Sequence, residues 1–249
     1  DPGFLESRIL LNLDSEEDGI FYIGCAGGLD TIVRLEVGLE DPPSGWKAYD
    51  IEITGLVGGH SGADIHLGRA NALKLLARAL GAASRETELR VCDVRGGNKR
   101  NAIAREAGAT VYLDPGKLER SKAVLARVQE DLATEFASTD PDLRISVEAA
   151  SPNEGAKVMD RAGQETFRNL LQAIPHGVVA MSKAVPGLVE TSTNAGVLSM
   201  KGNVVQIASL TRSSIDSAKM DVVDSIRCLG ALAGASVETK GGYPGWNPN

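Results

Sequence analysis

The chain has 249 residues, of which 43% are hydrophobic and 24% are charged, and its formal net charge at pH 7 is -7. This composition is typical of a globular protein with a sizeable core and excludes an intrinsically disordered chain. The acidic balance leaves no basic stripe for nucleic-acid phosphates, and no apolar run approaches the roughly 20 residues that cross a bilayer. We therefore expect neither a nucleic acid nor a membrane as a partner.

The three cysteines, Cys25, Cys92 and Cys228, are far apart in the sequence and show no CxxC spacing. An odd number of cysteines with such spacing predicts neither a disulfide framework nor a cysteine-bound zinc. This pattern favours a reducing compartment, so the expected location is cytoplasmic.

The first half of the chain alternates between strand-like and helix-like patterns. Apolar faces at helical spacing predict two helices, over 70–85 and 116–137. Runs rich in β-formers, bounded by turn residues, predict strands at 8–14, 20–27, 30–40, 48–57, 87–94, 110–115 and 143–150. From residue 48 to 150 the order is strand, helix, strand, strand, helix, strand, which is the ferredoxin-like plan.

The second half, about 151–239, is expected to repeat this plan. The pattern predicts helices at 160–174 and 222–234, and strands at 189–200, 203–212 and 236–241. One earlier strand, either 143–150 or 30–40, would have to be donated to complete the second unit. The predicted fold class is therefore α+β, with two ferredoxin-like βαββαβ units side by side in an open, mostly antiparallel sheet that carries its helices on one face. Such an architecture does not by itself indicate a function.

The stretch GLVGGHSGADIHLG, residues 55–68, holds two of the chain's three histidines, His60 and His66, among five glycines. Glycines beside a polar residue indicate a backbone conformation that side chains forbid, or a close approach to the backbone. His60 is therefore expected on a loop. A turn with a solvent-facing imidazole is the alternative interpretation. The third histidine, His176, lies in a predicted turn with no evident partner.

Two charged residues stand at the ends of predicted strands. Asp14 ends an apolar strand in LLNLDSEEDG, where an oxygen ligand would suit a metal ion, although an acidic loop is the alternative. Arg212 precedes SSID, where Ser213 or Ser214 would cap a helix. Its planar guanidinium could bind a carboxylate, or it could form a surface ion pair.

Two asparagines occupy matching places in the two halves, where a loop meets a strand. Asn194 lies in VPGLVETSTNAGV and Asn101 in GGNKRNAIAREA. Amide side chains at such points could contact a ligand, or they could only satisfy backbone groups.

Several motifs occur in a characteristic order along almost the whole chain. They are LNLDSEEDG, IGCAGG, GLVGGHSGADIHLGRANALKLLAR, GGNKRNAIAREA, VETSTNAGV, RSSIDS and YPGWNP. No single motif is specific, but the ordered set resembles the aminoacyl-histidine dipeptidases of the M20 metallopeptidase family.

The resemblance implies a cytosolic hydrolase with two zinc ions per active site, which cleaves dipeptides, especially Xaa-His, by metal-activated water. It also implies a catalytic domain interrupted by a lid. Residues 28–239 would form the lid, with units at about 48–150 and 151–239, and a homodimer could form through it. Residues 1–27 and 240–249 would be fragments of the catalytic domain.

The resemblance also assigns roles to the candidate residues. Asp14 would be a zinc ligand, and His60 would reach from the lid to stabilise the tetrahedral oxyanion. Arg212 would bind the substrate carboxylate, and Asn194 or Asn101 would supply a polar substrate contact.

Most family metal ligands and the general base have no counterpart in these residues, so we expect the chain alone to be inactive, to bind no zinc by itself and to need the missing catalytic domain. A free-standing ferredoxin-like interaction or ligand-binding module is the alternative function.

Overall fold

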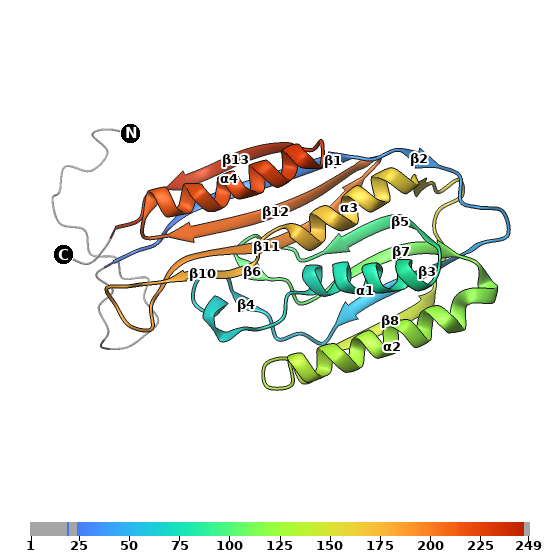
Figure 1. Cartoon of the computed structure of the whole chain (residues 1–249), viewed down its shortest axis with the longest axis horizontal. Helices are drawn as coiled ribbons and strands as arrows, with labels where there is room; N and C mark the ends of the chain where they lie inside the picture. The colour runs from blue at the N-terminus through green and yellow to red at the C-terminus, as the bar shows by residue number, and fades with distance from the viewer. Residues whose placement is uncertain (1–18, 20–23, 247–249) are drawn as a thin grey trace.

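The computed structural model describes residues 19 and 24–246 (Figure 1). The elements, in chain order, are β1 (Gly27–Glu36), β2 (Leu39–Glu40), β3 (Lys47–Thr54), β4 (Gly59–His60), η1 (Ile65–Leu67), α1 (Ala72–Glu86), β5 (Leu89–Gly96), β6 (Ala102–Ile103), β7 (Ala107–Leu113), η2 (Pro115–Lys117), α2 (Leu118–Glu135), β8 (Arg144–Ala149), β9 (Val158–Met159), α3 (Arg161–Ala173), β10 (Gly177–Met181), β11 (Val189–Lys201), β12 (Val204–Ser213), α4 (Asp216–Leu232) and β13 (Ser236–Tyr243). The strand predicted at 8–14, and most of the one at 20–27, lie outside the described residues.

A nine-stranded sheet forms one layer of the molecule, in the order β13-β1-β12-β11-β5-β7-β3-β8, with β10 added beside β11. Every strand pair described in this sheet is antiparallel, as predicted. Figure 1 shows α1, α2, α3 and α4 running across one face of the sheet. The helices contact one another in the order α2, α1, α3, α4, so they form a single second layer.

The first half follows the predicted order of elements. Strand β3 is followed by α1, β5, β7, α2 and β8, and these four strands lie in the order β5-β7-β3-β8. On β3, Tyr49, Ile51 and Ile53 are buried in the core beneath the helices, whereas Asp50 and Glu52 alternate with them and lie on the opposite face. We call that opposite side of the sheet the open face.

The second half is completed by β1. Strand β1 lies between β12 and β13 and pairs with both, so the strands of this half stand in the order β13-β1-β12-β11. Of the two candidates for the donated strand, the run at 30–40 therefore joins the second half. The run at 143–150 forms β8 and pairs with β3 in the first half.

The two halves meet through β11 and β5, which pair at Leu198 with Gly96 and at Ser199 with Arg95. Above this seam α1 packs beside α3. Helix α1 begins where the Asn71 side chain accepts hydrogen bonds from the N–H groups of Leu73 and Lys74. The same side chain donates to the carbonyl oxygen of Ala195 in β11, at 2.8 Å, and thereby ties the first half to the second.

The cap of α4 differs from the predicted one. The N-cap residue is Ile215, whose side chain makes no capping hydrogen bond, so neither Ser213 nor Ser214 is the N-cap. The Ser213 hydroxyl instead accepts from the N–H of Ile215 at 3.0 Å, because Ser213 is still part of β12 and faces the buried side of the sheet. Of the helices that the structure describes, none combines the length and apolar character needed to cross a membrane.

Candidate functional site

The loop between β3 and α1 presents His60. Strand β4, which contains His60, pairs with β6 through Gly59 with Ile103 and His60 with Ala102. Gly59 has a φ of 143°, and a Cβ placed there would lie 2.6 Å from Oδ2 of Asp64. A residue with a side chain is strained at this φ, so the backbone beside His60 uses the conformational freedom of glycine.

The orientation of the His60 ring is set within its own loop. The N–H of Ala63 donates to Nδ1 of His60 at 3.1 Å, and the N–H of His60 donates to Asp64 Oδ2 at 2.8 Å. Because Nδ1 accepts a hydrogen bond, the neutral ring carries its proton on Nε2. Desolvation, and then the positive charge of Arg212, lower the pKa of His60, while Asp64 opposes them. These effects favour the neutral form of the imidazole, which offers Nε2–H as a donor.

Arg212 lies beside this imidazole although it comes from β12. A Cβ placed on Gly62 would be 3.1 Å from Cε1 of His60 and 3.4 Å from Nε of Arg212, so both side chains flank Gly62. Nη1 of Arg212 donates to the Tyr243 hydroxyl at 3.1 Å, and Nε is buried with no partner among the described residues. The structure therefore brings together two residues that are 152 positions apart in the sequence.

Asn194 and Asn101 both lie near the His60 loop, but one is buried and the other is exposed. Asn194 is buried, with 1% of its surface exposed, and its amide donates to the carbonyl oxygens of Arg100 and Ala102, both at 2.8 Å. These carbonyls stand on either side of Asn101, whose side chain is exposed and whose own carbonyl accepts from Ser61 N–H at 2.9 Å. Asn194 thus holds the segment to which the His60 loop is paired.

Asn194→Ala is expected to lower the free energy of unfolding by about 1–3 kcal/mol, because two carbonyls lose a buried donor. Asn98→Ala, in the same loop but with an exposed side chain, is the matched control and should change it by less than about 0.5 kcal/mol. Denaturant unfolding of both variants would measure the difference. Equal midpoints for the two would contradict the proposed support by Asn194.

A cavity of about 730 Å³ adjoins Arg212 on the open face of the sheet. Ile32, Ala208 and Leu210 are among its apolar lining residues, and the polar ones include Asn101, Arg212 and Tyr243. Asp30 and Arg100 form an ion pair at its wall. Burial raises the pKa of the Asp30 carboxyl, and Arg100 opposes this effect.

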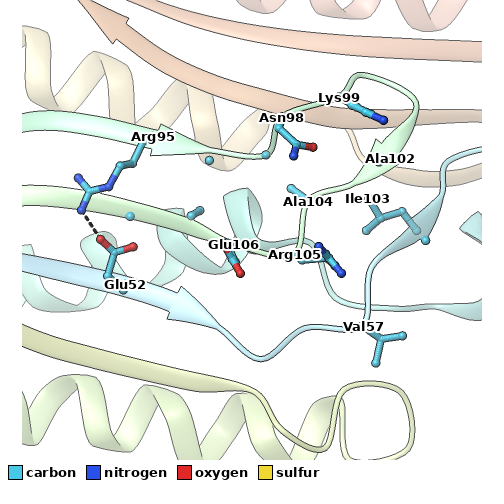
Figure 2. A pocket seen from close by; sticks show the side chains of 15 residues that line it. Glu52, Val57, Arg95, Asn98, Lys99, Ala102, Ile103, Ala104, Arg105 and Glu106 are labelled. Atoms are coloured by element: carbon cyan, nitrogen blue, oxygen red, sulfur yellow. Dashed lines mark hydrogen bonds and ion pairs between the residues drawn. The ribbon is translucent and has the colours of Figure 1, made fainter.

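A second cavity, of about 650 Å³, lies farther along the open face (Figure 2). Figure 2 shows Arg95 and Glu52 pointing toward one another; both are paired across the sheet with Gly108, whose lack of a side chain leaves room for their ion pair. Two basic residues of the segment 95–105 form ion pairs on this face, Arg95 with Glu52 and Arg100 with Asp30.

The remaining candidates lie elsewhere. Asp14 lies outside the described residues, which contain no group of three or more His, Cys, Asp or Glu side chains able to hold a metal ion. His176, for which the sequence suggested no partner, places Nδ1 3.3 Å from the Asn71 amide nitrogen. Burial, and then the charge of Lys74, lower the pKa of His176 to about 4.

Sequence reasoning missed the residues that shape the His60 loop. Asp64 and Arg69 form an ion pair at 3.6 Å, and Arg69 also donates to the carbonyl oxygen of Gly58 at 2.6 Å. Asp140 bonds to both ends of the loop, at Val57 and Ala70. The spacing of Asp64 and Arg69 around the glycines offered a weak signal, whereas nothing in the turn sequence STDPD distinguished Asp140 from a surface acid.

Comparison with known proteins gives consistent matches. Residues 51–140 match the family model of the peptidase dimerisation domain of the M20 type. The chain is 43% identical over 246 residues to the cytosol non-specific dipeptidase of Escherichia coli strain K12, and the match covers 99% of this chain and 50% of that protein.

Among solved structures, the aminoacylhistidine dipeptidase from Vibrio alginolyticus superposes with a TM-score of 0.91 at 40% identity, covering 99% of this chain and 50% of that one. The chain thus spans about half the length of the relatives it matches. Over almost its whole length the chain is therefore similar to one half of these two dipeptidases, and residues 51–140 match the M20 peptidase dimerisation domain.

Proposed function

We propose that this chain forms the lid of a zinc-dependent dipeptidase, and that His60 and Arg212 serve the substrate from the lid. The observation that carries the proposal is that two side chains flank Gly62: the His60 imidazole, whose Nδ1 accepts a hydrogen bond, and the Arg212 guanidinium. In a dipeptide, the scissile carbonyl is only one residue from the terminal carboxylate. Donors to these two groups must therefore be neighbours, as His60 and Arg212 are.

The two side chains would act on different groups of the substrate. Nε2–H of His60 would donate to the oxygen that becomes negatively charged in the tetrahedral intermediate, where a preorganised donor is most effective. Arg212 would bind the terminal carboxylate through its planar guanidinium and place the scissile bond beside His60. Asn101 is exposed in the adjacent cavity and could contact the substrate directly, whereas Asn194 would act by holding its loop.

The proposed substrates are dipeptides, with Xaa-His among the preferred ones. The Vibrio relative carries a name that specifies a C-terminal histidine, and the Escherichia coli relative is named as a non-specific dipeptidase. The preference for histidine therefore belongs to the proposal, and the hydrolysis of dipeptides in general has the wider support.

The domain organisation is also proposed. Residues 28–239 would form the lid, built from two ferredoxin-like units, and residues 1–27 and 240–249 would belong to the catalytic domain. The strand orders β8-β3-β7-β5 and β13-β1-β12-β11 support this, because each corresponds to the 4-1-3-2 order of a βαββαβ unit. The second unit would then include β1 in addition to residues 151–239.

Zinc is the proposed cofactor of the whole enzyme, with Asp14 as one ligand, although the described residues offer no complete ligand set. When bound, zinc in such an enzyme would activate the attacking water. The inactivity of these 249 residues on their own stays a prediction.

We also propose a homodimer formed through the lid and a cytoplasmic location. The match to a peptidase dimerisation domain supports the dimer, and the name of the Escherichia coli relative supports the location. The alternative of a non-catalytic binding module is not favoured, because the matched relatives are dipeptidases.

The full-length protein is expected to hydrolyse Xaa-His dipeptides, to lose this activity on treatment with a metal chelator and to regain it when Zn²⁺ is added back. Release of free histidine, followed with and without chelator, would measure this. No hydrolysis of any dipeptide would contradict the proposed activity, and hydrolysis that survives complete metal removal would contradict the proposed cofactor.

A further inference from the structure

A single buried carboxylate closes the loop that presents His60. The N–H of Val57 donates to Oδ1 of Asp140 at 2.9 Å, and the N–H of Ala70 donates to Oδ2 at 2.8 Å. Val57 and Ala70 are the two ends of the loop between β3 and α1. Asp140 comes from the connection between α2 and β8, 80 positions beyond His60, and only 1% of its surface is exposed.

The geometry gives each oxygen of Asp140 one backbone donor. Bonds from N–H groups to an ionised carboxylate are among the stronger hydrogen bonds in proteins, and a buried carboxylate needs them because it has lost its water. The position of Asp140 is itself held, since its N–H donates to the carbonyl oxygen of Phe136 at 2.8 Å and its carbonyl accepts from Leu143 N–H at 3.1 Å. The carboxylate of Asp140 is thus held in a fixed position, from which it binds both ends of the loop.

A second set of contacts, made by Arg69 and Asp64, also holds the loop. Arg69 donates to the Gly58 carbonyl at 2.6 Å and pairs with Asp64, whose Oδ2 accepts the N–H of His60. His60 therefore lies at the top of a closed loop whose two ends are held together by one side chain. Fixing the ends reduces the number of conformations that the loop can sample, and with it the positions open to the imidazole.

We propose that Asp140 is a positioning residue for His60. It touches no substrate; it clamps Val57 to Ala70 so that the imidazole stays aimed at the developing oxyanion. This inference rests on the proposed role of His60. It adds a residue that is remote in the sequence and buried beneath the loop, and it predicts that catalysis depends on a hydrogen-bonded clamp outside the site.

The test uses Asp140→Asn in the full-length enzyme. Asparagine is nearly the same size, but its NH₂ group cannot accept a hydrogen bond, so one of the two N–H donors loses its acceptor. We expect kcat to fall on the order of 10- to 100-fold, with a much smaller change in KM. Asp142→Asn removes an exposed carboxylate from the same connection and should leave kcat unchanged within about two-fold.

A double-mutant cycle with His60→Ala separates positioning from general destabilisation. If Asp140 acts through His60, Asp140→Asn should change kcat less than about two-fold once His60 is absent. An equal loss in both backgrounds would overturn the proposal. No effect of Asp140→Asn in the presence of His60, while His60→Ala is strongly impaired, would also overturn it. If His60→Ala itself is fully active, the proposed function of His60 fails instead, and the positioning role fails with it.

Hydrogen exchange tests the clamp without reference to activity. In the unaltered protein the amides of Val57 and Ala70 should exchange slowly although both lie in a loop. In Asp140→Asn at least one of them should exchange faster, while the amides of β3 and β7 keep their protection. Unprotected amides at both positions in the unaltered protein would overturn the proposal even if the variant fails to fold.

Discussion

In the proposed full-length dipeptidase, His60→Ala is expected to lower kcat by about 100- to 1,000-fold, with little change in KM. The neutral ring presents Nε2–H because Nδ1 already accepts the N–H of Ala63. A donor of this kind contributes most when negative charge develops on the substrate oxygen, so its loss slows the chemical step rather than substrate binding.

The control for this variant lies in the same loop. His66 is exposed in η1, and His66→Ala should leave kcat unchanged within about two-fold. His60→Gln retains an N–H donor on a side chain of similar reach and should lose less activity than His60→Ala. Steady-state kinetics with one dipeptide would compare the three variants. A turnover of His60→Ala within a few-fold of the unaltered enzyme would rule out oxyanion stabilisation by His60.

Arg212→Ala is expected to raise KM for dipeptides with a free carboxylate by about 10- to 100-fold, which corresponds to the loss of about 1.5–3 kcal/mol of charge-assisted hydrogen bonding. The increase for C-terminally amidated dipeptides should be much smaller, because an amide carries no charge for the guanidinium to bind. Parallel kinetics with matched acid and amide substrates would measure the difference.

A second consequence of this variant concerns the neighbouring histidine. The charge of Arg212 lowers the pKa of His60, so Arg212→Ala should raise that pKa toward its usual value. Arg34→Ala is the control, because it removes an arginine that is paired with Glu238 at the far end of β1. It should change neither the KM for dipeptides nor the pKa of His60. An equal rise in KM for acid and amide substrates would contradict carboxylate binding by Arg212.

The local elements of this fold could be predicted because their signals lie in short stretches of sequence. The helix predicted over 70–85 is α1, and Leu73, Leu76, Ala77 and Leu80 on its apolar face are all buried. Strands β11 and β12 also lie where β-rich runs predicted them. The patterns did not predict β10, which adds a short strand beside β11 with exposed valines at 178 and 179. A strand with little burial on either face leaves no alternating pattern to find.

Long-range pairing limited the prediction of both the sheet and the site. Two strands were open candidates for completing the second half, because both β1 and β8 have the composition of a central or edge strand and only their partners distinguish them. Likewise Asn194 and Asn101 stand at matching points of the two halves, yet one is buried beneath a loop and the other is exposed on it. Burial at such positions depends on what packs above them.

The sequence by itself determined the order of the four helices and of the long strands of the sheet, though not β10 or the two-residue strands. It also determined the glycine-rich loop around His60 and the set of candidate residues, because periodicity and glycine requirements are local properties of the chain. Only the tertiary structure decided that Arg212 stands beside His60, that Asn194 supports the segment containing Asn101 and that Asp140 closes the loop. Each of these contacts joins segments that are distant in sequence, and it forms only when sheet pairing brings their strands and connections together.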